Sequence, residues 1–392
     1  MRRSFKKIIC LGLSVALTAS MLAGCGSKKK DEGDKKDTFY IGGIGPISGG
    51  AAIYGQAVKN AAELAVEEIN AAGGMNGYKV EFKFADDEHD KEKSVNAYNV
   101  LKDWGMQILM GTVTSAPCVT VAEKTETDEM FQLTPSGSSV DCITGSNAFQ
   151  VCFTDPNQGV ASANYIGDNE LAKKVAVIYD SSTVYSSGIY AKFKSQAEAN
   201  KKFDIVYEGS FTSDTNKDFS VQLQGAKAAG ATLIFLPIYY AEASSIITQA
   251  DQMEYNVTFF GCDGLDGLLD VKNFDTKLAE GVLLLTPFAA DAKDDKTVSF
   301  VNKYKEKFGD TPIQFAADAY DAIYIIKAAI EQNKVTPDME ISEICEKLSD
   351  AITKLKFDGL TGTGMTWAAS GEVNKEPKAV VIENGVYVSY KK

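Results

Sequence analysis

The sequence is poor in the residues that catalysis and metal binding most often need. It contains a single histidine, His89, which lies in the acidic stretch DDEHD. One imidazole without a second makes a poor transition-metal site, so we expect a solvated acidic loop at His89 and no metal. A G-x-S-x-G motif is also absent, which argues against a serine hydrolase. We therefore predict that the chain is not an enzyme.

A phosphate-binding glycine loop is missing as well. The stretch Gly43-Ile44-Gly45 begins like a dinucleotide-binding fingerprint, but the third glycine is not in its place. Pro46 also removes a backbone N–H that a pyrophosphate would require. We predict no cofactor.

The chain has too little positive charge for a nucleic-acid partner. Its formal net charge is -13, and the N-terminal segment holds several of its basic residues. Binding to phosphates requires a basic surface, so nucleic acid is excluded as a partner.

The cysteines lack the spacing of a zinc site or a disulfide framework. There are seven, none in a C-x-x-C pair, and Cys10 and Cys25 belong to the N-terminal segment. Cys142 and Cys152 are close enough in sequence to pair across a loop, but we predict buried free thiols. The residues predicted to be buried free thiols are Cys118, Cys142, Cys152, Cys262 and Cys345.

The N-terminus carries the pattern of an export signal. MRRSFKK is basic, and IICLGLSVALTASMLAG follows without a charge. This run ends in Leu22-Ala23-Gly24-Cys25, which resembles the lipobox of bacterial lipoproteins; the alternative is a plain signal or a membrane anchor with an incidental cysteine. We predict a lipoprotein signal peptide over 1–24 and lipidation of Cys25, which would hold the chain outside the cytoplasm on the membrane. The polar stretch 25–38 is predicted to be a disordered tether.

From residue 39 onward the pattern alternates between strands and helices. FYIGGI, MQILMGTV and FQLTPSG are apolar strands in a first series, and KKVAVIYD, ATLIFLPI and NVTFFGCD belong to a second. Continuous apolar strands between amphipathic helices are typical of parallel sheets covered on both faces. The predicted fold class is α/β, with two doubly wound parallel-sheet lobes. Near the C-terminus, Asn384-Gly385 predicts a hairpin turn.

Ligands of such sheets bind beyond the carboxyl ends of the strands, and hydroxyl groups gather there in the first series. Ser115 follows a strand and begins a helix, so we expect it to be the N-cap of a carboxylate-binding helix end. Ser136 and Ser138 end the neighbouring strand and can add donors to the same anion.

The second series places a carboxylate at a strand end. In FFGCDGLDG, Asp263 follows the strand, whereas Asp266 behind it is expected to cap a helix or to be solvated. A carboxylate that faces an anion site across a cleft is complementary to a zwitterion. Aromatic residues would line the same cleft, and these are Tyr185 and Tyr239 from the second series, with Tyr54 and Phe315 from the first.

These residues resemble the type I periplasmic-binding-protein family, in particular the substrate-binding proteins of branched-chain amino acid ABC transporters. The resemblance covers residues 39–390, and GPISGGAAIYGQAVKNAAELAVEEINAAGGMNG is its most specific segment. It implies two lobes joined by three crossovers that close on a ligand. It also implies an N-terminal lobe and a C-terminal lobe, each of two segments: 39–153 with 287–358, and 154–286 with 359–392.

The resemblance assigns roles to individual residues. It implies that Ser115 binds the ligand carboxylate, Ser136 offers a backbone carbonyl to the ammonium, and Ser138 offers a hydroxyl group. The acidic ammonium ligand falls on Asp263. The aromatic positions fall on Tyr54, Tyr185, Tyr239 and Phe315.

Three of these positions depart from the family pattern. Asp263 stands where glutamate is frequent, Ser136 where alanine is found and Ser138 where threonine is found. We expect a monomer that binds an amino acid, branched-chain or a related hydrophobic or aromatic one, and delivers it to an ABC permease. A ligand-sensing module of a receptor system, or a binder of a non-amino-acid carboxylate or amide, are the alternatives.

Overall fold

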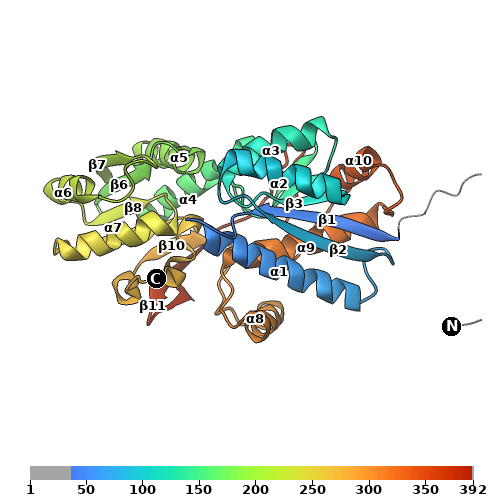
Figure 1. Cartoon of the computed structure of the whole chain (residues 1–392). Coiled ribbons are helices and arrows are strands. Elements are labelled where there is room, and N and C mark those ends of the chain that lie inside the picture. The colour runs from blue at the N-terminus through green and yellow to red at the C-terminus, as the bar shows by residue number, and fades with distance from the viewer. Residues whose placement is uncertain (1–36, 391–392) are drawn as a thin grey trace, which may run out of the picture. The chain divides into compact units, whose positions relative to one another are not determined.

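Strands and helices alternate through the chain as the hydrophobic pattern predicts (Figure 1). The structure is a computed structural model and describes residues 37–390. The predicted signal peptide, Cys25 and nearly all of the predicted tether lie outside the described residues. No helix within 37–390 is long and apolar enough to cross a membrane.

The first lobe is built on a five-stranded parallel sheet in the order β2-β1-β3-β4-β5. Its strands are β1 (Thr38–Gly45), β2 (Lys79–Asp86), β3 (Ile108–Gly111), β4 (Gln132–Thr134) and β5 (Ala148–Gln150). The helices between them are α1 (Ala52–Ala71), α2 (Lys91–Trp104) and α3 (Ser115–Thr127), with a short 3-10 turn η1 (Val140–Ile143).

The second lobe is built on a seven-stranded sheet in the order β12-β11-β10-β9-β8-β6-β7. Its parallel strands are β6 (Lys174–Asp180), β7 (Asp204–Phe211), β8 (Leu233–Leu236), β9 (Thr258–Gly261) and β10 (Leu283–Thr286). The hairpin of β11 (Lys378–Glu383) and β12 (Val386–Ser389) adds an antiparallel edge. Its turn residues Asn384 and Gly385 both have positive φ, 54° and 73°, which confirms the predicted turn.

The helices of the second lobe are α4 (Asp155–Asp168), α5 (Val184–Asn200), α6 (Ser220–Ala228) and α7 (Tyr240–Gln252). Three short 3-10 turns follow β9, namely η2 (Asp263–Leu265), η3 (Leu268–Asp270) and η4 (Thr276–Ala279). Helices α8 (Asp295–Phe308), α9 (Gln314–Gln332) and α10 (Ile341–Ile352) then return to the first lobe, where α9 packs against α1. Figure 1 shows α1 and α9 on one side of the first sheet, with α2 and α3 on the other.

The chain passes between the lobes three times: between β5 and α4, between β10 and α8, and between α10 and β11. The third passage lies against the first sheet, because Gln150 N donates to Gly371 O at 3.1 Å and Trp367 Nε1 donates to Gln150 O at 2.8 Å. The division of the chain at residues 153, 286 and 358 stays a prediction.

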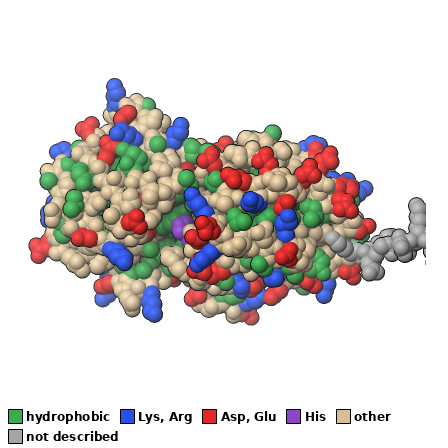
Figure 2. All heavy atoms as spheres, turned by 45° about the horizontal axis from the view of Figure 1, so that its top comes forward, with side chains coloured by type: hydrophobic (Ala, Val, Ile, Leu, Met, Phe, Trp, Pro, Cys, Tyr) green, Lys and Arg blue, Asp and Glu red, His purple; other side chains and the backbone are tan. Residues whose placement is uncertain are grey.

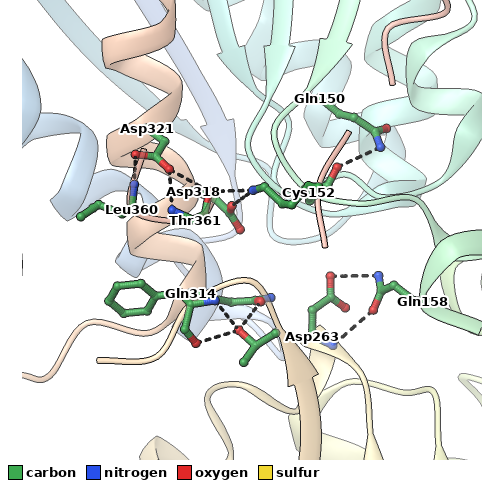
Figure 3. Close-up of polar contacts among 12 residues, drawn as sticks. Gln150, Cys152, Gln158, Asp263, Gln314, Asp318, Asp321, Leu360 and Thr361 are labelled. Atoms are coloured by element: carbon green, nitrogen blue, oxygen red, sulfur yellow. Dashed lines mark hydrogen bonds and ion pairs between the residues drawn. The ribbon is translucent and has the colours of Figure 1, made fainter. Parts of the chain in front are cut away.

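A buried ion pair stabilises the third passage. Lys375 Nζ lies 3.0 Å from Asp318 Oδ1, and both side chains are fully buried. Lys375 also donates to Thr361 Oγ1 at 2.6 Å, while Asp321 accepts from the backbone N–H groups of Leu360 and Thr361 (Figure 3). Helix α9 is thereby bonded to the segment that leads into β11.

We predict that Lys375→Met destabilises the protein by about 3–5 kcal/mol, because it leaves the buried Asp318 carboxylate without its cation. Urea unfolding measures this change. The double variant Asp318→Leu/Lys375→Met is expected to recover most of the loss. Lys354→Met, which removes an exposed ion pair with Asp350, is the matched control and should change stability by less than about 0.5 kcal/mol. Equal effects of the two lysine substitutions would contradict the prediction.

Candidate functional site

The strand order of both sheets predicts a ligand site at the carboxyl ends of particular strands. The order reverses between β1 and β3 in the first sheet and between β6 and β8 in the second. The loops that leave the carboxyl ends of strands at such points form the crevice of a doubly wound sheet. Seven of the eight predicted site residues follow the carboxyl ends of β1, β3, β4, β6, β8 or β9. The eighth, Phe315, lies at the start of α9.

Ser115 is the first residue of α3, and its hydroxyl group connects two loops. Its Oγ accepts hydrogen bonds from the N–H groups of Ser138 and Ser139, at 3.2 and 3.3 Å, and lies 3.4 Å from Ser138 Oγ. The prediction that Ser115 is the N-cap is wrong, because Thr114 occupies that position with extended backbone angles. Since α3 begins one residue earlier than expected, Ser115 contributes its own N–H to the free donors of the helix end.

Ser136 and Ser138 lie beside Ser115, after β4. Both are buried, and Ser136 Oγ donates to the carbonyl of Val113 at 2.7 Å. The carbonyl of Ser138 accepts from the N–H of Asp155 at 2.8 Å. The two strand-end loops therefore meet at the N-terminus of α3, where the helix end and the hydroxyl groups together favour an anion.

Asp263 is buried at the start of η2, just beyond β9. Tyr185 donates to its Oδ1 at 2.7 Å. Gln158 Nε2 donates to its Oδ2 at 3.0 Å, as Figure 3 shows. Burial raises the pKa of Asp263 to about 7, although the hydrogen bond from Tyr185 opposes this, and the charge of Asp318 adds to the increase. The carboxyl group is thus held in place by neutral donors.

A second buried carboxylate, Asp155, was missed by the sequence analysis. It is the first residue of α4, and its Oδ1 accepts no hydrogen bond from any described residue. Burial raises the pKa of Asp155 well above its ordinary value, and the neighbouring charges of Asp263 and Asp141 raise it further, against a hydrogen bond from Ser138. The sequence signal was the pair Asp155-Pro156, which is typical of a helix start but does not indicate a binding role.

The four predicted aromatic residues form one cluster. Tyr239 stacks on Tyr185 with ring centres 4.7 Å apart and meets Tyr54 edge-on at 5.5 Å. Tyr54 in turn stacks on Phe315 at 4.1 Å. Aromatic side chains from both lobes therefore lie against one another beside Asp263.

Tyr54 also bonds the lobes to each other. Its hydroxyl group donates to the carbonyl of Gly264 at 2.5 Å and accepts from the N–H of Tyr240 at 3.3 Å. Tyr240 returns the contact, because its hydroxyl accepts from the N–H of Ile53 at 3.2 Å. Tyr240 was not among the predicted residues, and the lobes are in contact at these tyrosines.

Two sequence interpretations of polar residues near the site require correction. Asp266 is buried rather than solvated. It does not cap a helix of its own segment; its Oδ2 accepts from the N–H of Gln314 at 2.7 Å, at the start of α9. His89 does not lie in a solvated loop. It is half-buried, and its Nδ1 lies 2.8 Å from Thr114 Oγ1. The partners, Gln314 and Thr114, are far away in the sequence, so no local pattern indicates these contacts.

The cysteines match the prediction of free thiols. All five within the described residues are buried and unpaired, including Cys142 and Cys152. Cys142 Sγ is within hydrogen-bonding distance of the carbonyl of Ser115, at 3.6 Å. Within 37–390 no group of three or more His, Cys, Asp or Glu side chains could hold a metal ion.

The raised pKa of Asp263 predicts a pH dependence of stability without ligand. Because the folded chain binds this proton more tightly than the unfolded chain, the contribution is fully present below about pH 4 and is lost as pH rises through about 7. The Asp263→Asn variant lacks the titrating group, so its free energy of unfolding should fall less than that of the wild type as the pH rises from about 4 to about 7. Urea unfolding at a series of pH values tests this. Asp310→Asn, at an exposed carboxylate, is the control, and parallel curves for Asp263→Asn and wild type would refute the prediction.

Known proteins share this architecture. A solved structure of the branched-chain amino acid transporter substrate-binding protein LivJ from Streptococcus pneumoniae, in complex with isoleucine, matches with a TM-score of 0.81 and 27% identity over 89% of this chain and 97% of that one. A solute-binding protein from R. palustris in complex with benzoate matches with a TM-score of 0.78 and 18% identity, over 90% and 95% of the chains, and shows the shared fold.

The sequence relatives agree with the structural ones. The Leu/Ile/Val-binding protein homolog 3 of Brucella melitensis is 31% identical over 85% of this chain and 88% of its own length. These relatives are described as binding proteins, which supports the prediction that the chain is not an enzyme. Periplasmic binding proteins act outside the cytoplasmic membrane, in agreement with the predicted export. A family profile described as periplasmic binding protein matches residues 38–385, and the chain belongs to this family.

Proposed function

We propose that the chain is the lipid-anchored solute-binding component of an ABC importer and that it binds an α-amino acid between its two lobes. One observation carries the proposal. Two buried carboxyl groups, Asp155 and Asp263, interact by charge, and Asp155 is hydrogen-bonded to Ser138, whose hydroxyl group lies 3.4 Å from that of Ser115 at the start of α3.

The short separation of the two charged regions suits an α-amino acid. Ser138 contacts both of them: its Oγ lies 3.4 Å from that of Ser115, and its side chain is hydrogen-bonded to the Asp155 carboxyl group, whose pKa burial raises despite this bond. An α-amino acid carries its ammonium and carboxylate on one carbon atom, so a single ligand can reach both groups. The ammonium would bond to Asp155 and Asp263, and the carboxylate to Ser115 and the first N–H groups of α3.

The aromatic cluster would receive the side chain of the ligand. Tyr54, Tyr239 and Phe315 offer apolar ring faces, which favours a branched-chain, hydrophobic or aromatic amino acid. The isoleucine complex of LivJ and the name of the Brucella relative support this class. Residue Asp263 has a shorter side chain than glutamate, so the ammonium would lie closer to the strand end of β9.

The two carboxylates should act together on the ammonium. We predict that Asp155→Asn and Asp263→Asn each weaken amino acid binding by about 1.5–3 kcal/mol, or roughly 10- to 150-fold in Kd, through loss of a charge-assisted hydrogen bond. Calorimetry with a panel of L-amino acids measures the change. The des-amino analogue 4-methylpentanoate, in place of leucine, is the control: the wild type should bind it only weakly, and neither variant should weaken this binding further, because the analogue has no ammonium group.

Two outcomes would reject the ammonium assignment. Unchanged affinity in both variants would remove the carboxylates from the site. Tight binding of the des-amino analogue by the wild type would instead favour a binder of carboxylates without an amino group. A permease encoded beside the chain favours transport, whereas a kinase or chemoreceptor partner favours sensing.

Anchoring depends on Cys25. We predict that the full chain expressed in a bacterium is found in the membrane fraction and incorporates a fatty-acid label, and that Cys25→Ser removes both properties. Cys10→Ser is the matched control and should change neither. A Cys25→Ser protein that stays labelled in the membrane fraction would exclude this cysteine as the anchor.

A further inference from the structure

The only histidine of the chain lies between the two lobes. His89 follows β2 and adopts a left-handed backbone conformation, with φ of 61°. Its ring is half-buried, and Figure 2, in which histidine is purple, shows it in the hollow between the lobes. A histidine at this place is a titratable group at the boundary that closes on the ligand.

One contact of the imidazole positions the anion-binding loop. Nδ1 of His89 lies 2.8 Å from Oγ1 of Thr114, the N-cap residue of α3. The next residue is Ser115, whose hydroxyl group accepts from two backbone N–H groups of the neighbouring loop. The imidazole therefore supports the helix start that would bind the ligand carboxylate.

The other contact reaches the second lobe. The ring of His89 meets the ring of Tyr239 edge-on, with centres 5.5 Å apart. Tyr239 stacks on Tyr185, which donates to Asp263. His89 is thus connected to both ends of the proposed ligand site, and the contact with Tyr239 exists only while the lobes are together.

Burial of the ring and the acidic groups around it have opposite effects on the pKa of His89. The backbone N–H of His89 donates to Asp87 in its own loop, where Asp90 also lies close, and Asp180 at the end of β6 acts on the ring from the second lobe. Glu242, near the start of α7, interacts with Tyr239 and Asp180. Burial lowers the pKa of His89, and the charges of Asp90 and Asp180 raise it without cancelling the effect of burial. The closed arrangement therefore favours the neutral imidazole.

We propose that His89 is a positioning residue whose neutral imidazole is needed for lobe closure, so that amino acid affinity falls when the imidazole becomes protonated. This inference rests on the proposed amino acid binding. By linkage, a ligand that stabilises the closed state must release the proton from His89 to the same extent that the proton weakens binding.

The single histidine permits a direct measurement. The mature protein, purified without a histidine tag and labelled with ring-13C histidine, gives one imidazole signal whose titration is followed by NMR. The probe is L-isoleucine, or the tightest-binding member of the amino acid panel if that is a different one. We expect saturation with this amino acid to move the imidazole titration to lower pH, and calorimetry to show at least a threefold larger Kd at pH 5.5 than at pH 8.

His89→Gln separates the imidazole from the carboxylates. Its amide can still bond to Thr114 but does not titrate, so the pH dependence of Kd should shrink to the part that Asp155 and Asp263 cause. An imidazole titration that is the same with and without a bound amino acid would overturn the inference while the proposed function stands. An unchanged pH profile in His89→Gln would do so too. Failure of every amino acid to bind would overturn the proposed function, and this inference with it.

Discussion

The burial of two carboxyl groups side by side is the constraint on which the site depends. Burial raises the pKa of both groups, the charge of Asp263 raises that of Asp155 further, and the charge of Asp318 raises that of Asp263 further. The buried cation of this region, Lys375, is bonded to Asp318 and Thr361 instead. Neutral donors from Tyr185 and Gln158 hold Asp263 in place without supplying a charge. Buried carboxyl groups without a cation are stabilised in their ionised form by a positive group, and the ammonium of an amino acid would supply one.

Much of the fold followed from the sequence because its signals are local. Apolar strands alternate with amphipathic helices, and the positive φ values at Asn384 and Gly385 are those that a two-residue hairpin turn requires. Strand ends were equally readable, so the positions of Ser115, Ser136 and Ser138 beyond β3 and β4 could be predicted as well. The general rule that ligands bind beyond strand ends then directed the site prediction to the carboxyl ends of the strands in each sheet.

What the sequence could not supply was the pairing of distant residues. Asp155 looks like an ordinary helix start until the fold places it beside Ser138 and Asp263. His89 lies in an acidic stretch that suggests solvent, yet Thr114 and Tyr239 cover it. Asp266 was expected to serve its own segment and instead caps α9 in the other lobe. In each case the partner is far away in sequence, so no local pattern reveals it.

The hydrogen bonds between the lobes stabilise the closed arrangement but do not determine which ligand is bound. Gly264, Tyr240, Ile53 and Gln314 contribute backbone groups to these bonds, and each such bond is worth only about 1 kcal/mol. Backbone groups are the same whichever ligand is bound, so these contacts set how much free energy the ligand must add and not which ligand is chosen. Selection falls to the side chains that would touch the ligand: the carboxylates at one end, Ser115 at the other and the aromatic cluster beside them. A ligand lacking any matching group leaves a buried partner unsatisfied, and that penalty is larger than the contribution of any one interlobe bond.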